Sequence, residues 1–161
     1  AERHRYVLGV KRDPASRGGS AWLHEQLRVG DVLDVQPPRN AFALDESAPH
    51  SVLVAGGIGI TPLACMAQRL RALGRPYTLH YAVARRDEAA LIEGVDGPEL
   101  HLHVDAEAGG VLDVAGIVAR APADAVLYGC GPAPILAAFE AACTARPGLV
   151  WRIERFTSSR P

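Results

Sequence analysis

The stretch Val52-Leu53-Val54-Ala55-Gly56-Gly57-Ile58-Gly59-Ile60-Thr61-Pro62 predicts a β-strand, a glycine-rich turn and the start of a helix. Its first four residues form an uninterrupted apolar run, which is typical of a parallel strand covered on both faces. Pro62 suits a first helical turn, because the N–H group that proline lacks has no partner there in any case. A plain tight turn also uses glycine, and Pro62 stands where the common dinucleotide motif has its third glycine. Between a strand and a helix, anion binding is nevertheless the better interpretation of this turn. Free N–H groups and the positive end of the helix dipole would face the anion, and glycine lets the backbone approach a pyrophosphate.

Strands and helices alternate along the rest of the chain. Beyond residues 52–55, strand-like segments are expected at residues 77–82, 99–104, 125–128 and 149–153. Helical patterns separate them at residues 62–73, 87–92, 113–120 and 134–144. The alternation predicts an α/β domain over residues 47–161, with an open five-stranded parallel sheet.

Residues 1–46 follow a different pattern. Strands are expected at residues 5–12 and 32–35, on either side of a polar loop and a short helix over residues 21–27. Ser20 stands immediately before that helix, where an N-cap belongs. This segment predicts a β-rich unit without an alternation of strands and helices.

Composition excludes several classes of protein. The 161 residues include 17 basic and 18 acidic side chains, a net charge of −1, which argues against nucleic-acid binding. No apolar run approaches the roughly 20 residues of a membrane span, and the first residues contain no apolar signal segment. Three scattered cysteines are too few for a disulfide framework or a metal site. We therefore expect a reduced, cytoplasmic protein that binds neither nucleic acid nor membrane.

Three further segments are candidates for chemistry. The turn Tyr128-Gly129-Cys130-Gly131-Pro132 follows the fourth strand, and it would line the same crevice as residues 56–62 if the first and fourth strands are neighbours. Cys130 fits equally well as a small buried side chain or as a residue that a ligand ring approaches. Arg17-Gly18-Gly19-Ser20 could hold a phosphate, but a capped helix explains it better. Arg85-Arg86-Asp87-Glu88 follows the second strand, where an acid suits a ribose 2′-hydroxyl and arginines suit a 2′-phosphate.

Five motifs together resemble a known family. They occur in the family's order and spacing at residues 18–20, 38–44, 55–62, 130–132 and 154–156. The chain resembles the ferredoxin–NADP reductase superfamily over nearly its whole length. It is most similar to the branch of phthalate dioxygenase reductase and vanillate demethylase reductase, which are flavin-dependent oxygenase reductases.

The resemblance implies a role for each motif. Residues 1–46 would be the C-terminal half of an antiparallel flavin-binding β-barrel, in which Arg17, Gly18, Gly19 and Ser20 hold the phosphate of FMN. The NAD(P)H pyrophosphate would lie on Gly56, Gly57, Ile58, Gly59, Ile60, Thr61 and Pro62, with Thr61 near the rings. Cys130, with Gly131 and Pro132, would lie beside the reacting nicotinamide, and Phe156 would cover the flavin. Asp87 and the branch favour NADH over NADPH.

The implied activity is electron transfer from NADH through FMN to an iron–sulfur centre of a Rieske-type aromatic oxygenase. The family's Arg-x-Tyr-Ser flavin motif is absent from these 161 residues, as are the closely spaced cysteines of a two-iron two-sulfur domain. We therefore expect the chain to be the middle of a longer reductase, with that cluster in a domain outside it. An FAD-dependent reductase of ferredoxin or free flavin is one alternative, and a non-catalytic dinucleotide-binding module is another.

Overall fold

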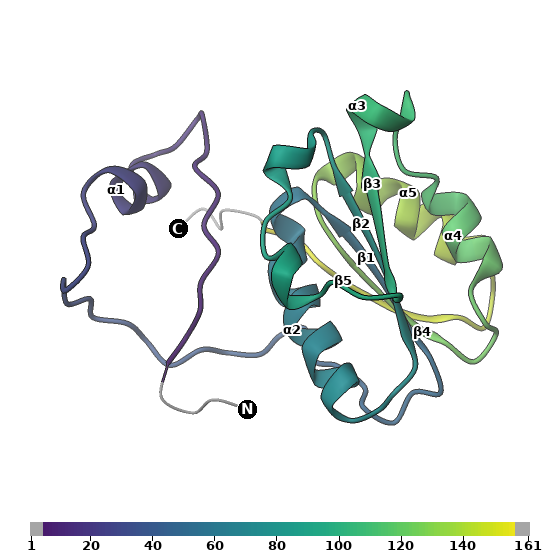
Figure 1. Cartoon of the computed structure of the whole chain (residues 1–161). Helices are drawn as coiled ribbons and strands as arrows, with labels where there is room; N and C mark the ends of the chain where they lie inside the picture. The colour runs from purple at the N-terminus through teal and green to yellow at the C-terminus, as the bar shows by residue number, and fades with distance from the viewer. Residues whose placement is uncertain (1–4, 157–161) are drawn as a thin grey trace. The chain divides into compact units, whose positions relative to one another are not determined.

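The computed structural model describes residues 5–156, and the chain divides into two compact units, Ala1–Ala41 and Phe42–Pro161. The larger unit contains a five-stranded sheet, whose strands all run parallel in the order β3-β2-β1-β4-β5 (Figure 1). The strands are β1 (Ser51–Gly56), β2 (Tyr77–Val83), β3 (Leu100–Val104), β4 (Val126–Cys130) and β5 (Val150–Glu154). The sheet that the sequence predicted is confirmed, and so is the expectation that the first and fourth strands are neighbours.

Helices cover both faces of this sheet (Figure 1). The central strand β1 is buried along its whole length, as its apolar run predicted. Alternate residues of a strand point to opposite faces. Leu53 therefore packs in a core with α2 (Ile60–Ala72), while Val54 packs in a second core with α4 (Val114–Arg120) and α5 (Ala133–Thr144).

The connections contain shorter helical turns. They are η1 (Gly57–Gly59), η2 (Arg86–Glu88), η3 (Ile92–Gly94) and α3 (Asp105–Ala108). The helix expected at residues 87–92 is therefore wrong. Two separate 3₁₀ turns lie there, because Ala89 is extended with ψ 92° and ends η2, and Leu91 is left-handed with φ 56° before η3 begins.

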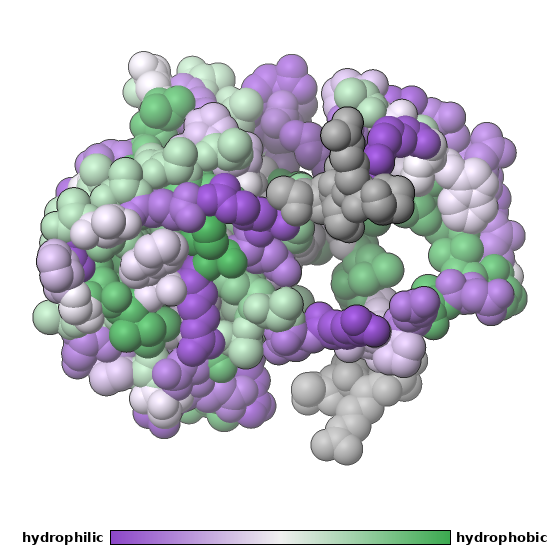
Figure 2. Space-filling view, turned by 180° about the vertical axis from the view of Figure 1, so that it is seen from behind, coloured by the Kyte–Doolittle hydropathy of each residue, from purple (hydrophilic) through white to green (hydrophobic). Residues whose placement is uncertain are grey.

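The smaller unit contains one helix, α1 (Gly19–Glu25), and no strand within residues 5–41. The strands expected at residues 5–12 and 32–35 are not formed, and the part of a barrel that they implied is not evident. A strand is defined by hydrogen bonds to a neighbour, and the apolar residues of these segments are exposed, with Tyr6 at 72% and Val32 at 92%. Figure 2 accordingly shows hydrophobic side chains on this unit's surface. The assignment of residues 1–46 to half of a flavin barrel stays a prediction.

Candidate functional site

Two glycine-containing turns meet at the carboxyl edge of the sheet, after β1 and after β4. The strands pair with Ala55 opposite Cys130, which brings the turns side by side. A Cβ atom on Gly59 would lie 2.2 Å from the Cys130 carbonyl oxygen, and one on Gly131 would lie 3.0 Å from Gly56 Cα. The two backbones are therefore in direct contact, which requires glycine at position 59 and leaves little room for a side chain at position 131.

Gly57 differs from the other glycines of this turn. Its φ is +50°, a left-handed value that favours glycine, and a Cβ atom there would meet nothing within 4 Å. There is thus free space beside Gly57, whereas the Cys130 backbone fills the space beside Gly59. Of the glycines in the predicted pyrophosphate turn, Gly57 is the one beside which a ligand has room.

The start of α2 has no side-chain cap. Its N-cap residue is Gly59, which has no acceptor to offer to the N–H groups of the first turn. Thr61 in that turn donates a hydrogen bond from its hydroxyl to the Ile58 carbonyl at 3.0 Å, so its proton is directed inward and its lone pairs stay available. The Ile60 N–H already donates to the Gly57 and Ile58 carbonyls, and Pro62 has no N–H group. What the start of α2 offers an anion is therefore mainly the positive end of the helix dipole, with no side chain in the way.

Cys130 lies at the last position of β4 and is fully buried. Burial, and to a smaller degree the charge of Glu154, raises the pKa of its thiol to about 12. The side chain is therefore a neutral thiol at physiological pH. The position of Cys130 beside a nicotinamide ring stays a prediction, as do the binding roles of Gly131 and Pro132.

The turn after β2 carries paired charges. Arg85 lies 3.2 Å from Asp87 and 3.5 Å from Glu88, measured from Nε to a carboxylate oxygen of each. Arg86 binds a residue that the sequence did not single out, Glu107 of α3, through two hydrogen bonds of 2.8 and 2.6 Å. Glu107 follows β3, and the adjacency of β2 and β3 is the signal that could have identified it.

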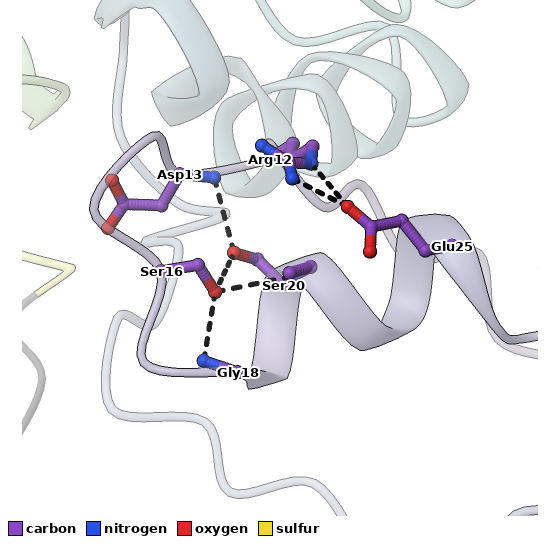
Figure 3. A network of polar contacts seen from close by, with 7 residues as sticks. Arg12, Asp13, Ser16, Gly18, Ser20 and Glu25 are labelled. Carbon is purple, nitrogen blue, oxygen red and sulfur yellow. Dashed lines mark hydrogen bonds and ion pairs between the residues drawn. The ribbon is translucent and has the colours of Figure 1, made fainter.

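The turn before α1 forms a network of polar contacts (Figure 3). The predicted cap is wrong, because Ser20 lies inside the helix and Gly18, with φ +117°, is the N-cap. The Ser16 hydroxyl takes the capping role, because it accepts hydrogen bonds from the Gly18 and Ala21 N–H groups, each at 3.2 Å. Ser20 donates its own hydroxyl to Ser16 at 3.0 Å. Ser16 is two residues further from the helix than an N-cap would be, which is why the local pattern did not point to it.

The predicted flavin contacts lie in both units. Arg17 and Gly18 are exposed, and a Cβ atom on Gly18 or on Gly19 would meet nothing within 4 Å, so this turn is open. Phe156 follows β5 in the larger unit, with 57% of its surface exposed. Each position is compatible with a contact to a ligand, and the roles themselves stay predictions.

Other groups give no metal or membrane site within residues 5–156. No cluster of three or more His, Cys, Asp or Glu side chains is arranged to hold a metal ion there. His80 and His101, in register on β2 and β3, stack with ring centroids 4.8 Å apart. No helix in this part of the chain is both long enough and apolar enough to cross a membrane.

The segment that precedes β1, residues 42–45, packs on Tyr128 of β4 in a contact that no sequence motif indicated. Tyr128 accepts a hydrogen bond from the Asp45 N–H at 2.7 Å, and its ring meets the buried Phe42 edge to face at a centroid distance of 5.8 Å. Arg152 of β5 donates to the Ala43 carbonyl and lies 6.0 Å from the centre of the Tyr128 ring. Residues 42–45 are thereby fixed to the same strand that ends at Cys130.

Comparison with known proteins gives consistent relatives, although no family model matches the chain. Phenoxybenzoate dioxygenase subunit beta of Ectopseudomonas oleovorans is 59% identical, over 89% of this chain and 46% of that protein. The vanillate O-demethylase oxidoreductase of Pseudomonas putida is 47% identical, over 81% of this chain and 42% of that protein. The crystal structure of full-length CYP116B46 from Tepidiphilus thermophilus matches with a TM-score of 0.86 at 44% identity, over 93% of this chain and 20% of that chain. The chain spans a little under half the length of these curated relatives.

Proposed function

The chain belongs to the oxygenase-reductase branch of the ferredoxin–NADP reductase superfamily, and from this we propose that its larger unit binds NADH for reduction of a flavin. The protein would then be the reductase component of an aromatic oxygenase system. The names of its relatives support this, since they include a dioxygenase subunit and a demethylase oxidoreductase. The whole reaction depends on more protein than these residues, because the chain spans about half of such relatives.

The observation that carries the proposal is the contact between the turns after β1 and β4. These strands lie side by side in the middle of a parallel sheet, while the chain continues from β1 to β2 on the opposite side. Ligands of open α/β sheets bind at such a reversal of strand order, outside the carboxyl ends of the strands. Gly57 is open at this point, and no side chain caps the start of α2. A pyrophosphate fits there because it needs backbone donors and close approach.

The residues of this site position and shield the reactants. Bound nicotinamide and flavin supply the hydride-transfer chemistry themselves, and the protein orients their rings and excludes water. Thr61 offers hydroxyl lone pairs at the start of α2. The neutral, buried thiol of Cys130 places a compact apolar group at the end of β4 without adding a charge. No proton has to move at either side chain.

For the flavin we propose FMN, held at its phosphate by Arg17, Gly18, Gly19 and Ser20 and covered by Phe156. The open surroundings of Gly18 and Gly19 support a phosphate contact. The Ser20 hydroxyl is at present directed to Ser16, so it would have to turn toward the phosphate. FAD is the alternative, and an adenine-binding surface would distinguish the two.

The electron acceptor that we propose is an iron–sulfur centre. A two-iron two-sulfur cluster would belong to a domain outside this chain, since no group of metal ligands is formed within residues 5–156. The final partner would be the oxygenase component, or a separate iron–sulfur protein if the chain is a ferredoxin reductase. A cytoplasmic location is part of the same proposal.

A second function, a dinucleotide-binding module without turnover, is favoured by one observation. The smaller unit forms no paired strand within residues 5–41, although half of a flavin barrel was expected there. Such a chain would still bind NADH through its larger unit, but it would not hold a flavin in a reactive position.

An anaerobic titration separates these functions. The protein is mixed with FMN or FAD, and NADH is added while the visible flavin absorption is followed. Bleaching faster than that of the free flavin supports a reductase, and the flavin that responds identifies the cofactor. NADH binding without accelerated bleaching supports the binding module. Absence of NADH binding contradicts both functions.

A further inference from the structure

A carboxylate from the neighbouring strand connection holds one of the two arginines that follow β2. Arg86 lies in η2 and Glu107 in α3, and the guanidinium donates one hydrogen bond to each carboxylate oxygen. The connections are also joined through their backbones, because the Ala106 N–H donates to the Ala84 carbonyl at 3.1 Å. A bidentate pair between two joined segments fixes the direction of the guanidinium plane.

Carboxylates outnumber guanidinium groups at the end of β2. The five paired side chains Arg85, Arg86, Asp87, Glu88 and Glu107 comprise two positive and three negative groups, a net charge of −1. A 2′-phosphate would add a further charge of roughly −1.5 to −2. It would also need a guanidinium, and that of Arg86 is bound on both of the nitrogens that face Glu107.

A ribose with a free 2′-hydroxyl makes a smaller demand. It needs one acceptor, and the carboxylate of Asp87 is 72% exposed. The hydrogen bonds from Arg86 also lower the pKa of Glu107 below its ordinary value. Glu107 therefore remains ionised, and stays a competitor for Arg86, throughout the neutral pH range.

We propose that Glu107 is a specificity-determining residue, which withholds the Arg86 guanidinium from a 2′-phosphate and thereby favours NADH over NADPH. This inference rests on the proposed function, because it places the adenosine ribose at the end of β2. Glu107 would thus control the selectivity from the connection after β3, although the ribose lies at the end of β2.

The test uses Glu107→Gln, which removes the charge and nearly preserves the shape. Isothermal titration calorimetry at constant ionic strength gives the Kd values of two probes, 5′-AMP and adenosine 2′,5′-bisphosphate. The wild-type protein is expected to bind 5′-AMP more tightly than the bisphosphate. The substitution is expected to shift the ratio of the two Kd values about tenfold toward the bisphosphate, the size of one charge-assisted hydrogen bond. Adding Arg86→Ala to the same protein should abolish that gain.

A matched control comes from a second bidentate pair. Glu46 accepts two hydrogen bonds from Arg69, of 2.8 and 2.9 Å, near the last turn of α2 and away from the carboxyl edge of the sheet. Glu46→Gln removes one carboxylate charge in the same way and should leave the Kd ratio unchanged. Far-UV circular dichroism and Tm confirm that each variant is folded.

The outcomes distinguish the two levels of the proposal. If the wild-type protein binds neither NADH nor 5′-AMP, the proposed function fails. If it binds both, three results would overturn the role of Glu107 alone: an unchanged ratio in Glu107→Gln, a gain that survives Arg86→Ala, or an equal gain in Glu46→Gln. A wild-type protein that already prefers the bisphosphate would overturn it as well.

Discussion

The hydroxyl oxygen of Tyr128 lies 2.7 Å from the backbone nitrogen of Asp45 and accepts its hydrogen bond across 83 positions of sequence. Tyr128 is fully buried on the central strand pair, whereas Asp45 belongs to the segment that leads into β1. The bond therefore fixes the entry to the sheet onto a strand that is added much later in the chain. The entry segment can therefore reach its final place only once β4 has joined the sheet.

A pair of tyrosines tests the energetic value of this bond. Tyr128→Phe removes an acceptor that the Asp45 N–H uses, and the free energy of unfolding should fall by about 1 kcal/mol. Tyr77→Phe should have the opposite or no effect, because the Tyr77 hydroxyl is buried without a hydrogen-bond partner among residues 5–156. Urea unfolding followed by circular dichroism measures both. Equal losses in the two variants would contradict this assignment.

Two glycines of the β1–α2 turn should respond differently to the same substitution. Gly59→Ala places a methyl group against the Cys130 carbonyl, and it should lower the free energy of unfolding by about 3 kcal/mol. Gly57→Ala meets no atom but has to adopt a left-handed φ, which costs about 1 kcal/mol. The milder variant should still weaken NADH binding, because its methyl group occupies the open side of the turn. Unfolding curves and NADH titrations separate the effects, and unchanged NADH affinity in Gly57→Ala would exclude the pyrophosphate from this position.

Much of the larger unit could be predicted because its signals are local. The apolar run before Gly56 marks a doubly covered strand, and the alternation of strands and helices implies a parallel sheet. The expectation that the turns after the first and fourth strands line the same edge depended on an assumption about strand order, which the structure confirms. The two turns that form the candidate site therefore do meet at the carboxyl edge of the sheet, and ligand binding there stays a prediction.

The features that could not be predicted depend on residues that are distant in the sequence or lie outside the usual position for their role. Glu107 reaches Arg86 because β2 and β3 are adjacent, and no local pattern of charges indicates that. Ser16 caps α1 from two residues before the N-cap Gly18, outside the usual capping position. The strands expected at residues 5–12 and 32–35 had a suitable alternation, but alternation describes the faces of a strand and does not supply its neighbour.

Only one of the three cysteines should react with a thiol reagent in the native protein. Cys65 is exposed on α2, whereas Cys130 and Cys143 are buried. Burial raises the pKa of the Cys130 thiol to about 12 and that of Cys143 to about 11, and the thiol form is a poor nucleophile. A Cys65→Ser variant should therefore show no rapid reaction until denaturant is added. A rapid reaction of that variant would mean that a second thiol is exposed in solution.

Acidification should destabilise the larger unit through His80. Burial, followed by the nearby charges of His101 and Arg120, lowers the pKa of His80 from 6.5 to about 4. The unfolded chain then binds the proton more readily than the folded one. The contribution of His80 to the free energy of unfolding is therefore fully present above pH 6.5 and is lost as the pH is lowered toward 4. The loss should be about 2 kcal/mol once the partial exposure of the ring is considered. His80→Gln should flatten the dependence of the unfolding free energy on pH within this range, and an identical slope in the variant would assign it to other groups.

Cys130→Ala provides the kinetic counterpart of the structural contacts at the carboxyl edge. The thiol adds no charge and donates no strong hydrogen bond, so its contribution under the proposed function is to the placement of the ring rather than to binding. Stopped-flow measurement of flavin reduction by NADH should show a rate lowered by about tenfold or more with a nearly unchanged Kd, because only an interaction specific to the transition state affects the rate alone. A parallel Cys143→Ala variant, which alters a buried thiol in the other core, should affect stability without changing that rate. Equal losses of rate and affinity in Cys130→Ala would show that the side chain supports the fold of the turn and does not contact the reacting ring.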